Sequence, residues 1–372
     1  MQKKSGKNHH GKYNDKIAYF CVPADFKNES LMKLVNLNDK YKDAKIDEVY
    51  GSLPQTEYGS GRSSTYIPNV KFSQLKNYIK ECNKYGIIFN YVLNASTLKN
   101  REFNNIEKKK IVLFIKKLSD AGVKRFTVTL PSLISLISNN LKDVEIVLSA
   151  VNNITSEYQL NEFLESGKII RAYVAEEMNR QPHKLKSIVL KSKIPIATIV
   201  NPFCLFQCAY RYHHYNVAAF RDKNDKCDVD EYYQFRCEQI KANNPEEIIK
   251  IPWIRPSDIN RYMDIGINYF KVAGREMIKV GADIPATVEA YMSKYYDGDL
   301  INLFNDFSNI RGNIYLPLKS KPLNAFFDYI FNKSTDCSRD LCDKCVMCKK
   351  YSKYVKTNKK EVSKLPKFKL LK

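Results

Sequence analysis

The feature that most constrains the fold is a regular alternation of short β-rich runs with amphipathic segments along most of the chain. The segment Ile106–Leu118, for example, carries an apolar face and has Glu107 in its first turn, as a surface helix should. Strands that alternate with helices imply right-handed βαβ crossovers and a parallel sheet, and eight repeats favour closure into a (β/α)8 TIM-like barrel. The eight expected strands are Ile17–Val22, Ile46–Gly51, Ile87–Leu93, Arg125–Leu130, Val144–Val151, Ile169–Val174, Ile194–Val200 and Asn268–Ala273.

One interval between expected strands is much longer than the others. The stretch from Ile194 to Asn268 contains four cysteines, two histidines and several arginines. Loops that follow the strands of a barrel lie on its catalytic face, so function is expected in the loop after the seventh strand. The barrel is expected over residues 15–300, with a small cysteine-rich C-terminal extension over 301–348 and basic tails over 1–14 and 349–372 that are expected to be disordered.

The net charge of +21 is concentrated at the two ends of the chain. Residues 1–16 contain five lysines against Asp15, and residues 349–372 contain ten against Glu361. Such tails can hold RNA phosphates without sequence specificity. The alternative is that lysine serves only as a solubilising residue, and the sequence leaves both interpretations open.

The sequence also indicates a compartment. No run of about 18 apolar residues could span a bilayer, and the first residues, MQKKSGKNHHGKYNDK, lack the apolar stretch of a secretory signal. We therefore expect a cytoplasmic protein without membrane contact, in which thiols stay reduced. Ten cysteines in that setting indicate metal or redox chemistry more than a disulfide framework.

Eight of the cysteines fall into two sets. Thiolates are soft ligands that suit iron–sulfur clusters and zinc, and close spacing lets one segment present several sulfurs to one centre. The second set has the spacing C-x4-C-x2-C-x2-C, which indicates a metal site but leaves zinc and a second iron–sulfur cluster open. The sets are Cys204, Cys208, Cys227 and Cys237 in the long interval, and Cys337, Cys342, Cys345 and Cys348 near the C-terminus.

Basic side chains accompany the first set. Arg211, His213 and His214 follow the first cysteines closely. They could bind an anionic substrate or transfer protons, because histidine titrates near neutrality, and His213 is the catalytic candidate among them. The alternative for these residues is a solvated or hydrogen-bonded loop group. Arg255 ends the long interval and Arg275 follows the eighth strand, so both are expected near the mouth of the barrel. There they could bind a carboxylate or a phosphate, since a guanidinium pairs bidentately with such anions. The alternative for both arginines is a structural role.

A family resemblance becomes specific at these residues. The segments NPFCLFQCAYRYHHYN, YYQFRC and IPWIRPSDINRYMDIGINYFKVAGRE resemble peptidase family U32, the collagenase-like peptidases. The family pattern is a cysteine-bearing loop, an Arg-Pro-x-Asp turn with a helix, and a strand that ends Phe-Lys-x-x-Gly-Arg. Two further segments resemble the family, Tyr50-Gly51-Ser52 after the second expected strand and Glu176-Glu177-Met178-Asn179-Arg180 after the sixth. The resemblance covers roughly residues 15–300.

The resemblance implies more than proteolysis. Several members of the family look like oxygen-independent hydroxylases that bind a [4Fe–4S] cluster and modify ubiquinone precursors, ribosomal RNA or transfer RNA, with prephenate implicated as oxygen donor. By that likeness Cys204, Cys208, Cys227 and Cys237 are cluster ligands. The spacing here departs from the usual one, which affects Cys227 most. The C-terminal cysteines lie outside the family pattern.

Two other classes of function remain open. A collagenase-like peptidase could use Cys204 or Cys208 as a nucleophile with His213 as its base. A partner subunit could bind RNA or carry electrons without chemistry of its own. The zinc-protease motif H-E-x-x-H, the serine-hydrolase motif G-x-S-x-G and the nucleotide-binding motif G-x-G-x-x-G do not occur.

Overall fold

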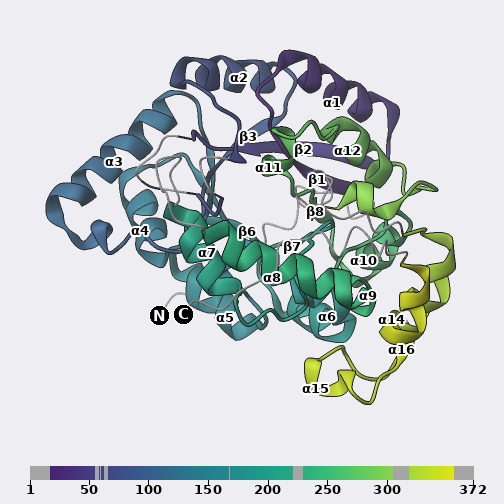
Figure 1. Ribbon diagram of the computed structural model, residues 1–372. Helices are drawn as coiled ribbons and strands as arrows, with labels where there is room; N and C mark the ends of the chain where they lie inside the picture. The colour runs from purple at the N-terminus through teal and green to yellow at the C-terminus, as the bar shows by residue number, and fades with distance from the viewer. Residues whose placement is uncertain are drawn as a thin grey trace, which may run out of the picture.

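The chain folds into a closed barrel of eight parallel strands in sequential order (Figure 1). The computed structural model describes residues 17–54, 58, 60–62, 66–166, 168–220, 229–304 and 318–355. The last strand closes the barrel by pairing with the first, with Tyr19 opposite Tyr269. All eight predicted strands are confirmed, and they are β1 Ala18–Pro23, β2 Ala44–Gly51, β3 Ile88–Leu93, β4 Arg125–Val128, β5 Glu145–Leu148, β6 Ile169–Tyr173, β7 Ile196–Ile199 and β8 Tyr269–Lys271.

Helices between the strands form the outer layer (Figure 1). The predicted helix at Ile106–Leu118 is α3, which begins after Asn104, whose side chain accepts hydrogen bonds from the backbone N–H groups of Ile106 and Glu107. Seven more helices follow strands or close the barrel: α1 Asn28–Lys40, α2 Phe72–Lys84, α4 Pro131–Asn140, α5 Glu157–Phe163, α6 Pro182–Lys191, α10 Ile259–Ile265 and α12 Ile284–Met292. Short turns are α11 Arg275–Ile278 and the 3-10 segments η3 Arg101–Phe103, η4 Ala150–Asn152, η5 Leu164–Ser166, η6 Glu176–Arg180, η7 Pro256–Asp258, η8 Leu300–Leu303 and η9 Lys321–Leu323.

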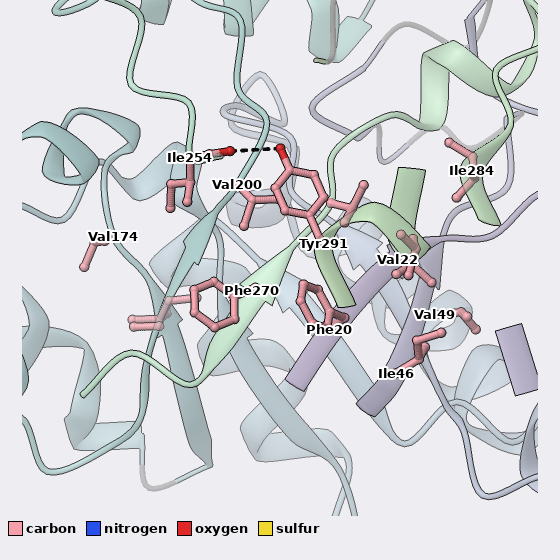
Figure 2. Packing of buried hydrophobic residues seen from close by; sticks show 14 of the residues in the cluster. Phe20, Val22, Ile46, Val49, Val174, Val200, Ile254, Phe270, Ile284 and Tyr291 are labelled. Atoms are coloured by element: carbon pink, nitrogen blue, oxygen red, sulfur yellow. Dashed lines mark hydrogen bonds between the residues drawn. The ribbon is translucent and has the colours of Figure 1, made fainter. Parts of the chain in front are cut away.

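The outward faces of the strands pack against these helices. Figure 2 shows Phe20 of β1 and Phe270 of β8 beside Tyr291 of α12, whose hydroxyl donates to the carbonyl of Ile254 at 3.0 Å. All four residues are buried. Apolar side chains of this size each contribute about 1.5–3 kcal/mol when they leave water, so this layer supplies much of the stability.

The alternate residues of the same strands face the interior of the barrel, which is unusually polar. Glu48 of β2 accepts from Arg125 of β4 at 2.6 Å and makes an ion pair with Arg171 of β6, also at 2.6 Å. Burial opposes ionisation of Glu48, but Arg171 and Arg125 outweigh it and hold its pKa below the usual range. The barrel floor is therefore a fixed ion cluster rather than an apolar plug.

Additional helices come from the long interval and from the C-terminal extension. The interval between β7 and β8 contains α7 Arg211–Phe220, α8 Val229–Asn243 and α9 Pro245–Lys250. The extension contains α14 Asn324–Asn332, α15 Arg339–Cys342, α16 Met347–Tyr351 and η10 Ser352–Tyr354, and α16 packs on α9 (Figure 1). The boundary expected for the lysine tail, residue 349, thus falls inside α16. None of the described helices is long and apolar enough to cross a membrane.

Candidate functional site

A cavity of about 190 Å³ lies at the strand-end side of the barrel, beneath the helices of the long interval. Its wall is built by the loop that follows β7, by α7 and α8, and by residues that follow β6 and β8. We call it the cysteine cavity because Cys204, Cys208 and Cys237 all line it. The fourth predicted ligand, Cys227, lies outside the described residues.

The three thiols are half-buried, and none is in a disulfide. Burial, with Glu176 nearby, raises the pKa of Cys204 to about 12. Burial also raises the pKa of Cys237, and the thiol of Cys208 adds to that effect. Burial thus favours the protonated form of Cys204 and Cys237, and a bound metal would displace those protons.

Cationic side chains surround these thiols. Arg62, Arg211, Arg236 and Lys241 all line the cysteine cavity. Arg211 donates to Glu177 at 2.6 Å and to the carbonyl of Leu205 at 3.2 Å, which ties α7 to the loop between the cysteines. Thiolate-bound clusters carry negative charge, and neighbouring cations and hydrogen-bond donors stabilise that charge. The donor set and its surroundings therefore fit an iron–sulfur cluster.

A single metal ion fits the described residues less well. No three His, Cys, Asp or Glu side chains among them converge as ligands of one ion would. Ligands of a single zinc lie about 2.0–2.3 Å from the same point. A four-iron cluster binds each thiolate to a different iron, so its cysteines lie further apart.

The two histidines differ in position. His213 is exposed on α7 and does not line the cavity. His214 lines it, and its ring stacks on Tyr233 with 5.2 Å between the ring centroids. Burial, together with Arg62, lowers the pKa of His214 to about 4, so its ring is neutral at pH 7. The sequence pointed to the exposed member of this pair as the proton-transfer group.

A second, smaller cavity of about 50 Å³ opens at the mouth of the barrel. We call it the mouth cavity. It shares Arg62, Glu176 and Tyr215 with the cysteine cavity, so the two adjoin. Burial raises the pKa of Glu176, which makes this carboxyl a candidate proton carrier between them.

Lys271 and Arg275 line the mouth cavity, and both are buried. Arg275 donates to the hydroxyl of Ser52 at 3.0 Å, and Lys271 lies 3.9 Å from the ring centroid of Tyr50. Neither makes an ion pair with any carboxylate among the described residues. Burial lowers the pKa of Lys271 to about 8. Two buried cations that lack a counter-ion suit a small anion such as a carboxylate.

Arg255 lies elsewhere, although the sequence suggested the same mouth. It lines neither cavity. Its guanidinium is held by both carboxylate oxygens of Asp258 at 2.6 and 2.9 Å, and it also donates to Ser320 and Asn324. Since it is 2% exposed and its donors are occupied, Arg255 fastens the extension to the barrel.

Sequence reasoning did not single out Arg62 and Glu176 as site residues; it considered His214 only beside His213, and it left the direction of Lys271 open. The signals for two of them were present, because Glu176 follows β6 directly and Lys271 ends β8. Residues at the ends of barrel strands face the catalytic side. The inward direction of Lys271 depends on the strand register, which a single sequence does not reveal. No local pattern marks Arg62.

Comparisons with known proteins were made for the whole chain. The model of the family described as peptidase family U32 matches residues 35–299, which is more than half of the chain. The chain is 27% identical over 335 residues to an uncharacterized protease of Methanocaldococcus jannaschii, covering 88% of this chain and 95% of that protein.

Solved structures give more distant likenesses. A structure described as a U32 peptidase aligns with a TM-score of 0.49 and 13% identity, covering 74% of this chain and 96% of the other. The A-subunit of tryptophan synthase from Pyrococcus furiosus aligns with a TM-score of 0.40 and 11% identity, covering 75% and 97%.

Proposed function

The chain belongs to peptidase family U32, and we propose that within this family it is an iron–sulfur-dependent enzyme. Its reaction would be an oxygen-independent hydroxylation, or a related redox modification, of an RNA or a small aromatic metabolite. One observation carries the proposal: three cysteines line a cation-walled cavity that adjoins an anion-attracting cavity at the barrel mouth. Cofactor chemistry and substrate binding would thus take place side by side.

Cys204, Cys208 and Cys237 would hold the cluster, with Cys227 from outside the described residues as the expected fourth ligand. A bound [4Fe–4S] cluster supplies one-electron transfer or, with an open iron, a site for an oxygen ligand. The chain's own part is to orient the thiolates and to stabilise their charge. Arg211 does both, because it links α7 to the loop at Leu205 and lies close to Cys204.

The mouth cavity would bind the anionic part of a substrate or oxygen donor. The planar guanidinium of Arg275 can donate two parallel hydrogen bonds to a carboxylate, and the ammonium of Lys271 adds a compact positive charge. Tyr50 and Tyr173 also line the mouth cavity. Glu176 lines both cavities, and burial raises the pKa of its carboxyl, which suits a group that passes a proton between them. Arg255 has a structural role in this proposal, and exposed His213 has none.

A peptidase is the second candidate, because a relative of similar length is called an uncharacterized protease. A cysteine nucleophile acts as a thiolate and needs a base within hydrogen-bonding reach. Burial raises the pKa of Cys204 to about 12, and His214, the histidine that lines the same cavity, is a weak base because its pKa is lowered to about 4. Both observations favour a ligand role for these thiols over a nucleophilic one.

RNA as substrate or partner is proposed on charge alone. The lysines of residues 1–14 and 356–372, which lie outside the described residues, could bring RNA phosphates to the barrel. A hydroxylation withdraws two electrons from the substrate, so an electron acceptor would complete the reaction, either the oxygen donor itself or a partner subunit.

The test is the metal content of the loop site. Chain purified without oxygen should be brown, and the double variant Cys204→Ser/Cys208→Ser should lose about four irons and four sulfides. Cys82→Ala, which removes a buried thiol of α2, is the matched control and should keep both. If instead the parent chain is colourless and hydrolyses a peptide in a way that Cys204→Ala abolishes, the peptidase reading replaces this one.

A further inference from the structure

The C-terminal quartet, Cys337, Cys342, Cys345 and Cys348, is anchored to the body of the barrel. The backbone N–H of Cys337 donates to the carbonyl of Arg180 at 3.2 Å, and the side chain of Gln181 donates to the carbonyl of Cys337 at 2.8 Å. Cys337 and Cys348 both pack against the main hydrophobic core. The first and last cysteines of the quartet therefore belong to the folded structure and not to a loose tail.

Contacts with α14 and with the turn after Cys337 hold three of the thiols. The hydroxyl of Tyr329 lies 3.7 Å from the sulfur of Cys345. The ammonium of Lys333 lies 5.8 Å from the centroid of the Tyr329 ring and 2.9 Å from the sulfur of Cys337. The sulfur of Cys342 lies 3.4 Å from the carbonyl oxygen of Ser338, the residue after Cys337. Neighbouring groups of one small segment thus hold Cys337, Cys342 and Cys345.

Two cations lie beside this set, Lys333 at the end of α14 and Arg180 after β6. The ammonium of Lys333 donates to the sulfur of Cys337 at 2.9 Å. Arg180 is 2% exposed, donates to the backbone carbonyls of Trp253 and Ile251, and lies over the rings of Trp253 and Phe327, while its Nε has no hydrogen-bond partner among the described residues. No carboxylate within the described ranges makes an ion pair with Arg180. A buried guanidinium without a counter-ion is costly, and the thiols of Cys337 and Cys348 lie within its electrostatic range.

We propose that the C-terminal quartet binds one metal centre through four thiolates, with Arg180 and Lys333 as counter-cations. Four thiolates outweigh the charge of a bound dication, so the centre would supply the negative charge that Arg180 lacks. The spacing suits zinc or an iron–sulfur cluster, since both take four cysteine ligands. No three His, Cys, Asp or Glu side chains of the described chain already stand as the ligands of one metal ion, so the thiols would draw together when either group binds.

The proposed centre would also support the loop that carries Cys204 and Cys208. Arg339 lies between the first two cysteines of the quartet. Its Nε and Nη2 donate to the carbonyl of Phe206 at 3.0 and 2.7 Å. Its backbone N–H donates to the side chain of Gln207, which has a φ of +48°. A residue other than glycine adopts that left-handed conformation only where its surroundings hold it. The quartet's metal would fix Arg339 and, through it, this turn.

Metal analysis of two double variants tests the proposal in the full-length chain. Cys342→Ser/Cys345→Ser changes the two members that do not pack on the core, and it should lose about one zinc, or about four irons and four sulfides. The loop variant Cys204→Ser/Cys208→Ser should keep that portion of the metal. The two variants therefore show separately whether the loop cysteines and the C-terminal quartet bind metal. If the Cys342→Ser/Cys345→Ser variant binds as much metal as the parent chain, the proposal is wrong.

A second measurement does not depend on a variant that folds poorly. Cobalt added to the metal-free Cys204→Ser/Cys208→Ser variant, in which two of the competing loop thiols are gone, should give the intense thiolate-to-cobalt absorption of a tetrathiolate site. In that background Lys333→Gln should weaken the binding by about 10- to 100-fold, as the loss of a group supporting metal ligands does. Lys344→Gln, an exposed charge change in the same segment, should leave it unchanged. Absence of the absorption in the loop variant, or equal affinity in the two lysine variants, would contradict the assignment.

Discussion

At the scale of single residues, Lys271 and Arg275 share a cavity but respond differently to pH. An exposed lysine keeps its charge to about pH 10.4, whereas burial lowers the pKa of Lys271 to about 8. Arginine stays charged throughout. The mouth cavity therefore loses one of its two unpaired cations as the pH rises through about 8.

We expect the affinity for a small carboxylate such as benzoate to fall about tenfold or more above that pH, because a charge-assisted hydrogen bond is lost. Stability should change in the opposite direction. A lysine with a lowered pKa binds its proton less tightly in the folded state, so the free energy of unfolding increases as the pH rises from about 8 toward 10.4. Calorimetric titration at several pH values measures the first effect, and denaturant titration the second.

The variant Lys271→Met should bind benzoate weakly at every pH and show no change near pH 8. Lys80→Met removes an exposed lysine of α2 and serves as the control, with parent affinity and parent pH dependence expected. Identical pH profiles for parent and Lys271→Met would show that the lysine does not contact the anion.

The sequence identifies site residues most readily when the residue type, such as clustered cysteine, rarely has a purely structural role in a reducing compartment. Cys204, Cys208 and Cys237 line one cavity, as the clustering of thiols suggested. Arg255 shows the limit, because Asp258, three residues later, already occupies its guanidinium. Nothing in the sequence distinguishes an arginine that binds its own turn from one that faces a ligand.

At the scale of elements, periodicity predicted the barrel strands well and the added helices poorly. The strands lie buried between interior and outer layers, so their apolar runs are conspicuous. The helices α7 and α8 instead carry polar, charged and aromatic residues toward the cysteine cavity, as Arg211, Tyr233 and Cys237 do. A helix that lines a polar cavity lacks the clean apolar stripe on which the prediction depends.

The described part of the extension ends at Val355, shortly after α16 and η10. Tyr351 is buried against Phe326, with 5.4 Å between the ring centroids, and Val355 is buried as well. Tyr351→Ala should therefore lower the free energy of unfolding by about 3 kcal/mol, as the loss of a buried aromatic ring does. Deletion of residues 356–372 should leave it unchanged. Denaturant titration measures both, with Tyr295→Ala, whose ring is exposed, as the control. Equal stability of Tyr351→Ala and the parent would place this segment outside the core.

At the scale of the whole molecule, the charge asymmetry bears on RNA. Residues 1–14 contribute four lysines, and residues 356–372 contribute seven against Glu361. If these segments recruit RNA, deleting both should weaken binding to a single-stranded oligonucleotide and flatten its salt dependence, because fewer counterions are released. Filter-binding titrations between 50 and about 200 mM salt measure the slope. An unchanged slope would leave solubility as the role of the tails.

The contact of Arg339 with Glu247 and Phe206 has a consequence for how the protein is made. Arg339 and Glu247 are 92 residues apart in the chain. A ribosome adds about 5–20 residues per second, so Glu247 emerges on the order of ten seconds before the side chain that will hold it. During that delay the cysteine loop lacks one of its supports. If the loop binds the proposed cluster, its insertion is therefore expected after synthesis has ended, and a nascent chain should be a poor acceptor.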